Sequence, residues 1–333
     1  MGKDHDFDPA QSLVMALSKT MRCLTFLAVL CIVSAACGPA GEKLSAPSRS
    51  QRPDFAPLVE GQRSPDGLQA ILGTADLGVG RHRVGFLLNS TEGIVDVPIV
   101  SVSSRYLRGE GKGRVEIETS ESLVREKVPA SFHPWPVGAR GLYITWLTFD
   151  QAGRWALDIQ VRERAGNVLS TSIAFPVAER PMAPIVGSPA PRSKSKTLAG
   201  VRRFEEVTTG SLHDPDLYRT SIANAAASGN PTVITFASPA FCTNAVCGPQ
   251  LDVLQELKNK YRQRANFIHV DFYDNPQEIQ GDLRKARISS TVLEWKLPSI
   301  EWSFVLDRHG NVAARFEAFA TFQELETELL KVL

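Results

Sequence analysis

The feature that most constrains the fold is a change of periodicity partway along the chain. Between about residues 77 and 177, apolar and polar side chains alternate with a period of two, which is typical of half-buried strands. Beyond about residue 204, short apolar runs alternate with segments of helical periodicity. The segment 181–203 between them begins with a run rich in Pro, Ser and basic residues, typical of a linker. The sequence therefore predicts two domains of different structural class.

The first domain, residues 67–180, is predicted to be an all-β sandwich. About seven short strands with regular turns and no long helix favour the antiparallel Ig-like arrangement. Its aromatic residues are expected in the core, and they are Trp135, Trp146, Phe149 and Trp155. The stretch 141–161 resembles the small Ig-like modules of exported bacterial proteins, such as the YtkA-like domain, in its aromatic and Gly pattern.

The N-terminus, residues 1–37, has the pattern of an export signal. Lys19 and Arg22 precede the apolar run Leu24–Val33, which is too short to span a bilayer. The following Ser34-Ala-Ala-Cys37 resembles a bacterial lipoprotein signal, which implies that Cys37 becomes lipidated. Ordinary signal-peptidase cleavage, which would leave Cys37 as a free thiol, is the alternative. Residues 38–66 read as a flexible tether, so we expect an exported, lipid-anchored protein on the extracytoplasmic side of the cell membrane.

Composition excludes several classes of protein. Hydrophobic residues make up 43% and charged residues 22% of the 333 residues, which is ordinary for a globular chain. The net charge of +1 argues against a nucleic-acid partner. The sequence has no Gly-rich phosphate loop, no Ser/His/Asp set and no zinc-type cysteine spacing, so we expect neither a bound cofactor nor a metal.

The C-terminal part, residues 204–333, is predicted to be an α/β domain with the order β, α, β, α, β, β, α. Residues 214–227 have helical character, and Leu251, Leu254, Leu257 and Tyr261 are spaced for one helix face. Thr321 and Glu324 form a capping box that starts a final helix. The expected strands are 232–237, 266–272, 303–306 and 312–316. Asp271 and Asp274 follow a strand end and are expected to cap it or face solvent.

Two cysteines remain in the folded body once the signal is set aside. Cys242 comes just after the strand 232–237, and Cys247 follows it near the start of a helix. Export places the pair in an oxidising compartment, where disulfides persist. A helix N-terminus carries a partial positive charge, which stabilises a thiolate and raises its reactivity.

The chain from about residue 184 onward resembles the thioredoxin superfamily in its extracytoplasmic TlpA-like branch. The resemblance rests on Val186–Pro191 (VGSPAP), the strand–Cys–helix unit, the hairpin Asp307–Gly310 and the final helix. It implies a thioredoxin-like fold and thiol-disulfide exchange with extracytoplasmic proteins, with electrons passed to or from an unknown partner. Cys242 would be the nucleophile and Cys247 the resolving cysteine, joined in a disulfide. Residues implied to line the substrate groove are Phe241, Pro298, Glu301 and Trp302.

Two departures from the family pattern bear on this site. The family spacing is C-x-x-C, whereas four residues separate Cys242 from Cys247. Five residues of regular helix rise about 7.5 Å, which exceeds the Cα separation of about 7 Å that a disulfide tolerates. Pro249 therefore favours a helix that begins near Cys247, with Cys242 in the preceding loop. The alternative is a helix that begins near Thr243 and is kinked at Pro249, in which closing the disulfide would unwind a turn.

At the position of the family's cis-proline stands Glu301, with Pro298 three residues earlier. Either the loop is remodelled so that Pro298 serves, or the substrate groove is altered. A carboxylate at Glu301 would raise the pKa of a nearby thiol.

Three alternatives remain open at the level of sequence. The C-x4-C spacing also resembles the bacterioferritin-comigratory peroxiredoxins, although Thr235 and Pro239 replace the Pro and Thr of the peroxide pocket. A copper carrier would combine the two thiolates with a distant histidine such as His269 or His309. The third alternative is a non-enzymatic binding lipoprotein whose disulfide is only structural.

Overall fold

The computed structural model describes residues 59–107, 124–136, 140–163, 166–211, 214–241 and 247–333. All of these belong to one compact unit, Arg49–Leu333. The predicted signal with Cys37, most of the predicted tether, and Cys242 lie outside the described residues. Among the described residues, no helix has the length and apolarity needed to cross a bilayer.

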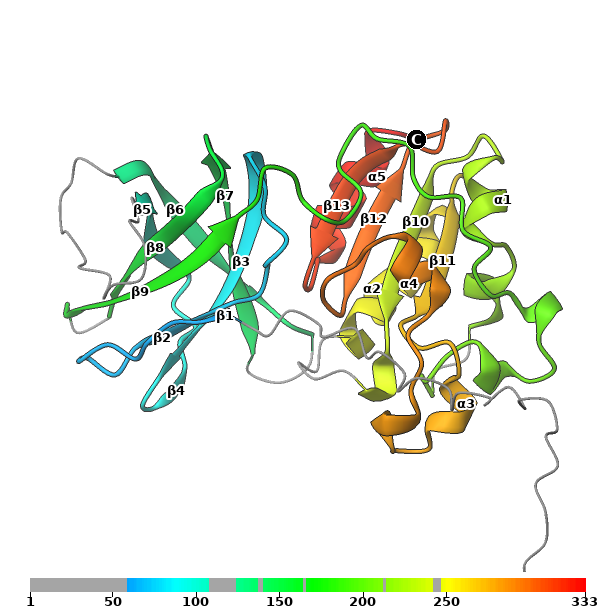
Figure 1. Cartoon of the computed structure of the whole chain (residues 1–333), viewed down its shortest axis with the longest axis horizontal. Helices are drawn as coiled ribbons and strands as arrows, with labels where there is room; N and C mark the ends of the chain where they lie inside the picture. Colours follow the sequence, from blue (N-terminus) through cyan, green and yellow to red (C-terminus); the bar gives the residue numbers. More distant parts are fainter. Residues whose placement is uncertain (1–58, 108–123, 137–139, 164–165, 212–213, 242–246) are drawn as a thin grey trace, which may run out of the picture. The chain divides into compact units, whose positions relative to one another are not determined.

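The N-terminal strands form one antiparallel sheet (Figure 1). Its path is β1-β2-β3-β7-β6-β5-β8-β9, with β4 paired to β3. Strand β9 at one end of this path contacts β1 and β2 at the other end, and Gly78 forms a bridge to Ala178. The sheet is therefore nearly closed on itself. Its strands are β1 Val59–Glu60, β2 Gln69–Leu72, β3 Gly80–Ser90, β4 Gly93–Ile94, β5 Ile99–Leu107, β6 Val124–Pro134, β7 Gly141–Phe149, β8 Gly153–Arg162 and β9 Val168–Val177.

The alternation seen in the sequence places one face of each strand in the core of this sheet. Trp155 is fully buried on β8, and its ring centroid lies 5.0 Å from that of Phe149 on β7. Trp135 is also buried, but it belongs to a cluster with Val233 and Leu254 of the second domain and not to the core of this sheet. Trp146 is not buried, because it lies on the outward face of β7, where it is 44% exposed beside the guanidinium of Arg81.

The predicted Ig-like sandwich is wrong. A sandwich divides its strands between two facing sheets, whereas here every strand from β1 to β9 belongs to one sheet. The period-two pattern is the same in both arrangements, because each buries one face of every strand. The order in which strands pair depends on long-range contacts, and the alternation does not encode it.

A second sheet of four strands follows, with the order β11-β10-β12-β13. Strands β10 and β11 are parallel, and the other two pairs are antiparallel. The strands are β10 Thr232–Ala237, β11 Asn266–Asp271, β12 Trp302–Leu306 and β13 Val312–Glu317. The α-helices are α1 Ile222–Ala226, α2 Cys247–Tyr261, α3 Pro276–Ile279, α4 Ser290–Glu294 and α5 Phe322–Leu330. Short 3₁₀ turns are η2 Leu198–Gly200, η3 Phe204–Glu206, η4 Pro215–Tyr218, η5 Pro239–Phe241 and η6 Leu283–Lys285.

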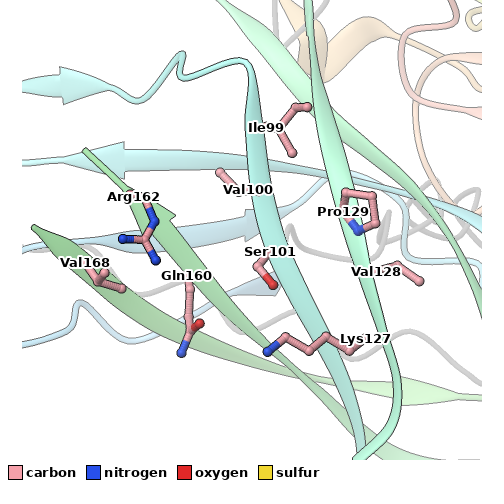
Figure 2. Close-up of a pocket in the computed structure, with 9 residues that line it drawn as sticks. All are labelled: Ile99, Val100, Ser101, Lys127, Val128, Pro129, Gln160, Arg162 and Val168. Atoms are coloured by element: carbon pink, nitrogen blue, oxygen red, sulfur yellow. The ribbon is translucent and has the colours of Figure 1, made fainter. Parts of the chain in front are cut away.

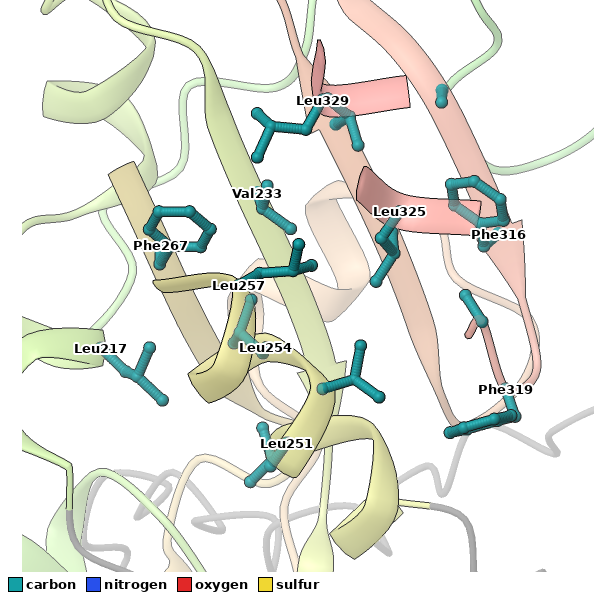
Figure 3. Packing of buried hydrophobic residues seen from close by; sticks show 14 of the residues in the cluster. Leu217, Val233, Leu251, Leu254, Leu257, Phe267, Phe316, Phe319, Leu325 and Leu329 are labelled. Atoms are coloured by element: carbon teal, nitrogen blue, oxygen red, sulfur yellow. The ribbon is translucent and has the colours of Figure 1, made fainter. Parts of the chain in front are cut away.

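Apolar side chains pack against this sheet in two clusters. Figure 3 shows the first, in which α2 contributes Leu251, Leu254 and Leu257 and α5 contributes Leu325 and Leu329. The second cluster joins residues of β10, β11 and β12 to α1, to α4 and to Trp295. Residues of the predicted linker 181–203 also pack here, since Ala183 and Ala190 belong to the second cluster.

The prediction of a thioredoxin-like α/β domain is contradicted as well. The described chain is predominantly β, and of its five α-helices only α2 and α5 exceed five residues. The helix expected over 214–227 is divided into η4 and α1, because Ser221 caps a new helix start with its side chain. The individual strands were predicted correctly, but helical periodicity overstated the helical content.

Candidate functional site

The candidate site begins where β10 ends. All six residues of β10 are buried, which places the strand in the centre of the second sheet. The chain then turns through η5, and α2 starts at Cys247. The prediction that the helix begins near Cys247 is confirmed, and Pro249 lies in its first turn, where a missing N–H costs no helical hydrogen bond.

Cys247 is completely buried and is disulfide-bonded. The other four cysteines of the chain, Cys242 among them, lie outside the described residues. The sulfur of Cys247 lies at the N-terminal end of a helix of 15 residues. Partial positive charge and free N–H groups at such an end stabilise a thiolate when the disulfide opens.

The four predicted groove residues lie in two places. The ring of Phe241, at the end of η5, packs edge-on against that of Tyr273, with 6.1 Å between the centroids. Pro298 is half-buried between α4 and β12. Trp302 is fully buried, with its indole N–H donating to Ser299, so its side chain packs in the core and lines no open groove.

Glu301, the fourth of these residues, has an unusual environment. It immediately precedes β12 and is 0% exposed. Its backbone φ of 81° is a left-handed conformation that residues other than glycine rarely adopt. All described peptide bonds are trans, so no cis-proline takes its place. Burial raises the pKa of the Glu301 carboxyl well above its ordinary value, which favours the neutral acid.

A buried polar cluster that the sequence did not reveal lies beneath η5. Asp271, at the end of β11, is 4% exposed and accepts two hydrogen bonds from Thr209, through the backbone N–H at 2.6 Å and the hydroxyl at 2.8 Å. The Thr209 hydroxyl also contacts Ser238 and accepts from the backbone of Ala240 in η5. Burial raises the pKa of Asp271 to about 6. Asp271 therefore anchors the segment that leads to the cysteines. Of its two expected roles, it caps the strand end by accepting from the backbone N–H of Tyr273, and it does not face solvent.

The histidines named for a copper site do not converge. His269 is buried, with Nδ1 2.6 Å from the Tyr218 hydroxyl and Nε2 3.1 Å from the carbonyl of Ala237. Both ring nitrogens are thus occupied, and burial lowers the pKa of His269 to about 4. His309 lies in the turn between β12 and β13. Within the described ranges no group of three metal-binding side chains occurs.

Two hollows are lined by described residues that do not include Cys247. The smaller, of about 490 Å³, lies on β5, β6, β8 and β9 of the first sheet (Figure 2). It combines the exposed apolar side chains Ile99 and Val168 with the cations Lys127 and Arg162. The larger, of about 740 Å³, includes Trp146 and Arg315. Neither contains a residue that the sequence marked as a site residue.

Comparison with known proteins finds no family model that matches the chain and no match among curated proteins. Among solved structures, the soluble domain of PmoD from Methylocystis sp. ATCC 49242 (Rockwell) aligns at 12% identity. The alignment covers 36% of this chain and 89% of that one, with a TM-score of 0.21. Similarity this low supports no inference about fold or function.

These comparisons also correct the family resemblances drawn from the sequence. Neither the thioredoxin superfamily nor the YtkA-like module is matched. The motifs that suggested them are short, and Pro/Gly turns, hairpins and strand–Cys–helix junctions arise in many folds. Any function of the cysteines must therefore be argued from their surroundings.

Proposed function

We propose that this chain carries out thiol-disulfide exchange with other extracytoplasmic proteins, using Cys242 and Cys247. One observation carries the proposal: Cys247 is disulfide-bonded at the first residue of α2, the α-helix that follows the buried central strand β10 along the chain. A helix start stabilises the thiolate that forms when the bond opens. The dithiol is itself the redox group, so the reaction needs no further cofactor.

The burial of Cys247 assigns the order of events. A substrate cannot reach its sulfur directly, so exchange takes place at Cys242. In the reducing direction, the Cys242 thiolate attacks a substrate disulfide and releases one substrate thiolate. The Cys247 thiolate then attacks the Cys242 sulfur of the mixed disulfide and releases the second substrate thiolate. Two electrons pass from the dithiol to the substrate, and the Cys242–Cys247 disulfide forms.

Export and anchoring complete the proposal. A lipid on Cys37 would hold the chain at the membrane, and residues 38–66 would allow the folded body to reach protein partners nearby. The electron donor or acceptor would be another extracytoplasmic dithiol. Cys37→Ser should release the protein from the membrane fraction without changing the reactivity of Cys247. Retention of the variant at the membrane would contradict the anchor.

Trapping of a mixed disulfide tests the exchange reaction. In cells producing the full chain, Cys247→Ser should accumulate adducts that disappear on reduction, because the Cys242–substrate bond can no longer be resolved. The matched variant Cys242→Ser should give none, since its remaining thiol is buried. Equal adducts from both variants, or none from Cys247→Ser, would overturn the proposal.

A further inference from the structure

The larger of the two hollows has the dimensions of a small-molecule site. Its volume of about 740 Å³ falls within the range of about 300–1,000 Å³ that is typical of ligand pockets. Strands β3, β7 and β13 line it, together with residues from the segments 74–79 and 179–186. All of these segments belong to one compact unit. None of the lining residues belongs to the candidate cysteine site, so the hollow needs an explanation of its own.

The hollow gathers apolar side chains that the fold leaves uncovered. Its lining residues Val79, Trp146, Ile185 and Val186 are between 39% and 58% exposed. The chain has five tryptophans, and the other four are buried, so Trp146 is the one indole that the described structure leaves open to solvent. Exposed apolar groups scattered singly over a surface are ordinary, whereas a group of them in one concave hollow is typical of a binding site.

Hydrogen bonds to one buried residue, Asp76, fix the walls of this hollow. The Asp76 carboxylate accepts from the backbone N–H groups of Met182 and Ala183, at 2.7 and 3.0 Å, and pairs with Arg315 of β13 at 2.7 Å. The backbone N–H of Asp76 donates in turn to the carboxylate of Glu317, also on β13. Three segments far apart in the sequence are thus joined, so the hollow is formed before a ligand enters. A preformed site loses less conformational entropy on binding.

The charges that remain in the lining favour an anionic ligand. Most charged groups of the lining are already paired or hydrogen-bonded, namely Asp76, Arg83, Arg315, Glu317 and Glu328. Within the described ranges no ion pair involves the other three, Arg81, Arg180 and Glu179, which are all exposed. Two cations therefore stand against one anion. The guanidinium of Arg81 lies 5.4 Å from the centre of the Trp146 ring, so a positive charge and an open aromatic face occur side by side.

We propose that this hollow binds a small aromatic organic anion, a function that is independent of the exchange reaction. The aromatic body of the ligand packs against Trp146 and against the exposed aliphatic side chains of Val79 and Ile185. Its carboxylate, sulfonate or phosphate group lies beside Arg81, with which it forms a charge-assisted hydrogen bond. Removal of the apolar surfaces from water supplies most of the affinity, and Arg81 supplies the preference for an anion.

Two fluorescent dyes with the same aromatic body test the proposal on the full-length protein without detergent. The first, 8-anilino-1-naphthalenesulfonate, carries a sulfonate, which the second, N-phenyl-1-naphthylamine, lacks. We expect Trp146→Ala to raise the dissociation constants of both dyes about tenfold or more, because both lose the indole face. Arg81→Gln should raise the constant of the sulfonate dye about fivefold or more and leave that of the neutral dye unchanged.

Two control variants match these changes. Glu179→Gln removes a charge of the opposite sign from the same hollow, so it should not weaken the binding of either dye. Ile99→Ala shortens an apolar side chain that is 61% exposed in the smaller hollow (Figure 2), and it should leave both dissociation constants unchanged.

The outcomes decide between the two hollows and between charge and apolarity. A wild-type protein that binds neither dye, or a Trp146→Ala variant that binds both as tightly as the wild type, would overturn the site. An equal loss in Ile99→Ala would also overturn it, because the smaller hollow would then share in the binding. An equal effect of Arg81→Gln on both dyes would overturn the anionic ligand. If Trp146→Ala fails to fold, Arg81→Gln decides by the same comparison, since Arg81 is exposed. None of these results depends on the disulfide, so the exchange reaction stands or falls separately.

Discussion

Asp271 illustrates what a single residue gains from its surroundings. In the sequence it is one of two acidic residues after a strand, and nothing nearby shows that residues 208–210 fold over it. In the structure it is buried, and Thr209 holds it in place. Hydrogen bonds from a segment more than 60 residues away have no local signature.

A pH dependence of stability follows from Asp271. Its folded pKa of about 6 lies above the ordinary value of 3.8, so the folded state binds the proton more tightly. The contribution of Asp271 to the free energy of unfolding is fully present below about pH 4. About 2–3 kcal/mol of it is lost as the pH rises through about 6. Asp271→Asn should remove this loss, so the stability of the variant relative to the wild type should rise as the pH increases from about 4 to about 6, measured by urea titration at several pH values. A stability difference between variant and wild type that does not change with pH would contradict the assignment. Neighbouring groups cannot produce this change: burial lowers the pKa of His269, so its contribution has the opposite sign, and burial raises the pKa of Tyr218, which titrates only at alkaline pH.

Helix α2 shows how well a long helix can be predicted from the sequence. Leu251, Leu254, Leu257 and Tyr261 were expected on one face, and all four are buried. Pro249 marked the helix start correctly, because proline is best tolerated in the first turn. The shorter helices were less predictable, since their ends depend on caps and on packing more than on periodicity. The segment 214–227 is the clearest example.

The packing of α2 predicts a large loss of stability on truncation. Leu254 is 0% exposed within the cluster of Figure 3. Leu254→Ala should lower the free energy of unfolding by about 2–5 kcal/mol, because it removes buried area and leaves a cavity. Leu330→Ala, at a helical position that is 52% exposed, is the control and should cost less than about 1 kcal/mol. Chemical denaturation of both variants checks this, and a similar loss in both would refute it.

At the scale of the whole molecule, one buried and one half-buried arginine connect residues far apart in the sequence. Arg83 of β3 bonds to Glu324 and to the carbonyls of Glu317 and Phe319. Arg315 of β13 bonds to Asp76 at 2.7 Å and to the carbonyl of Ala183. Pairs separated by more than 100 residues cannot be recognised from one sequence. The same limit explains why the alternation in the sequence predicts a sandwich where the structure has a single, nearly closed sheet.

Arg83 should accordingly be one of the most sensitive positions outside the apolar core. Arg83→Ala leaves Glu324 and two carbonyls without their donor, and breaking a buried pair in this way costs about 3–5 kcal/mol. Arg81→Ala, two residues earlier on the outward face of β3, should cost about 0.5 kcal/mol or less. Thermal unfolding of the two variants compares them directly. Equal effects would show that Arg83 makes no special contribution.

The central claim is that the disulfide of Cys247 opens and closes in the folded protein. Its burial also suits a permanent structural bond, and the two cases differ in reduction potential. Equilibration of the folded chain with glutathione mixtures, followed by thiol counting, measures that potential. We predict a value above about −300 mV, in the range of exchangeable disulfides. A lower value, or a bond that yields only when the protein unfolds, would contradict the account.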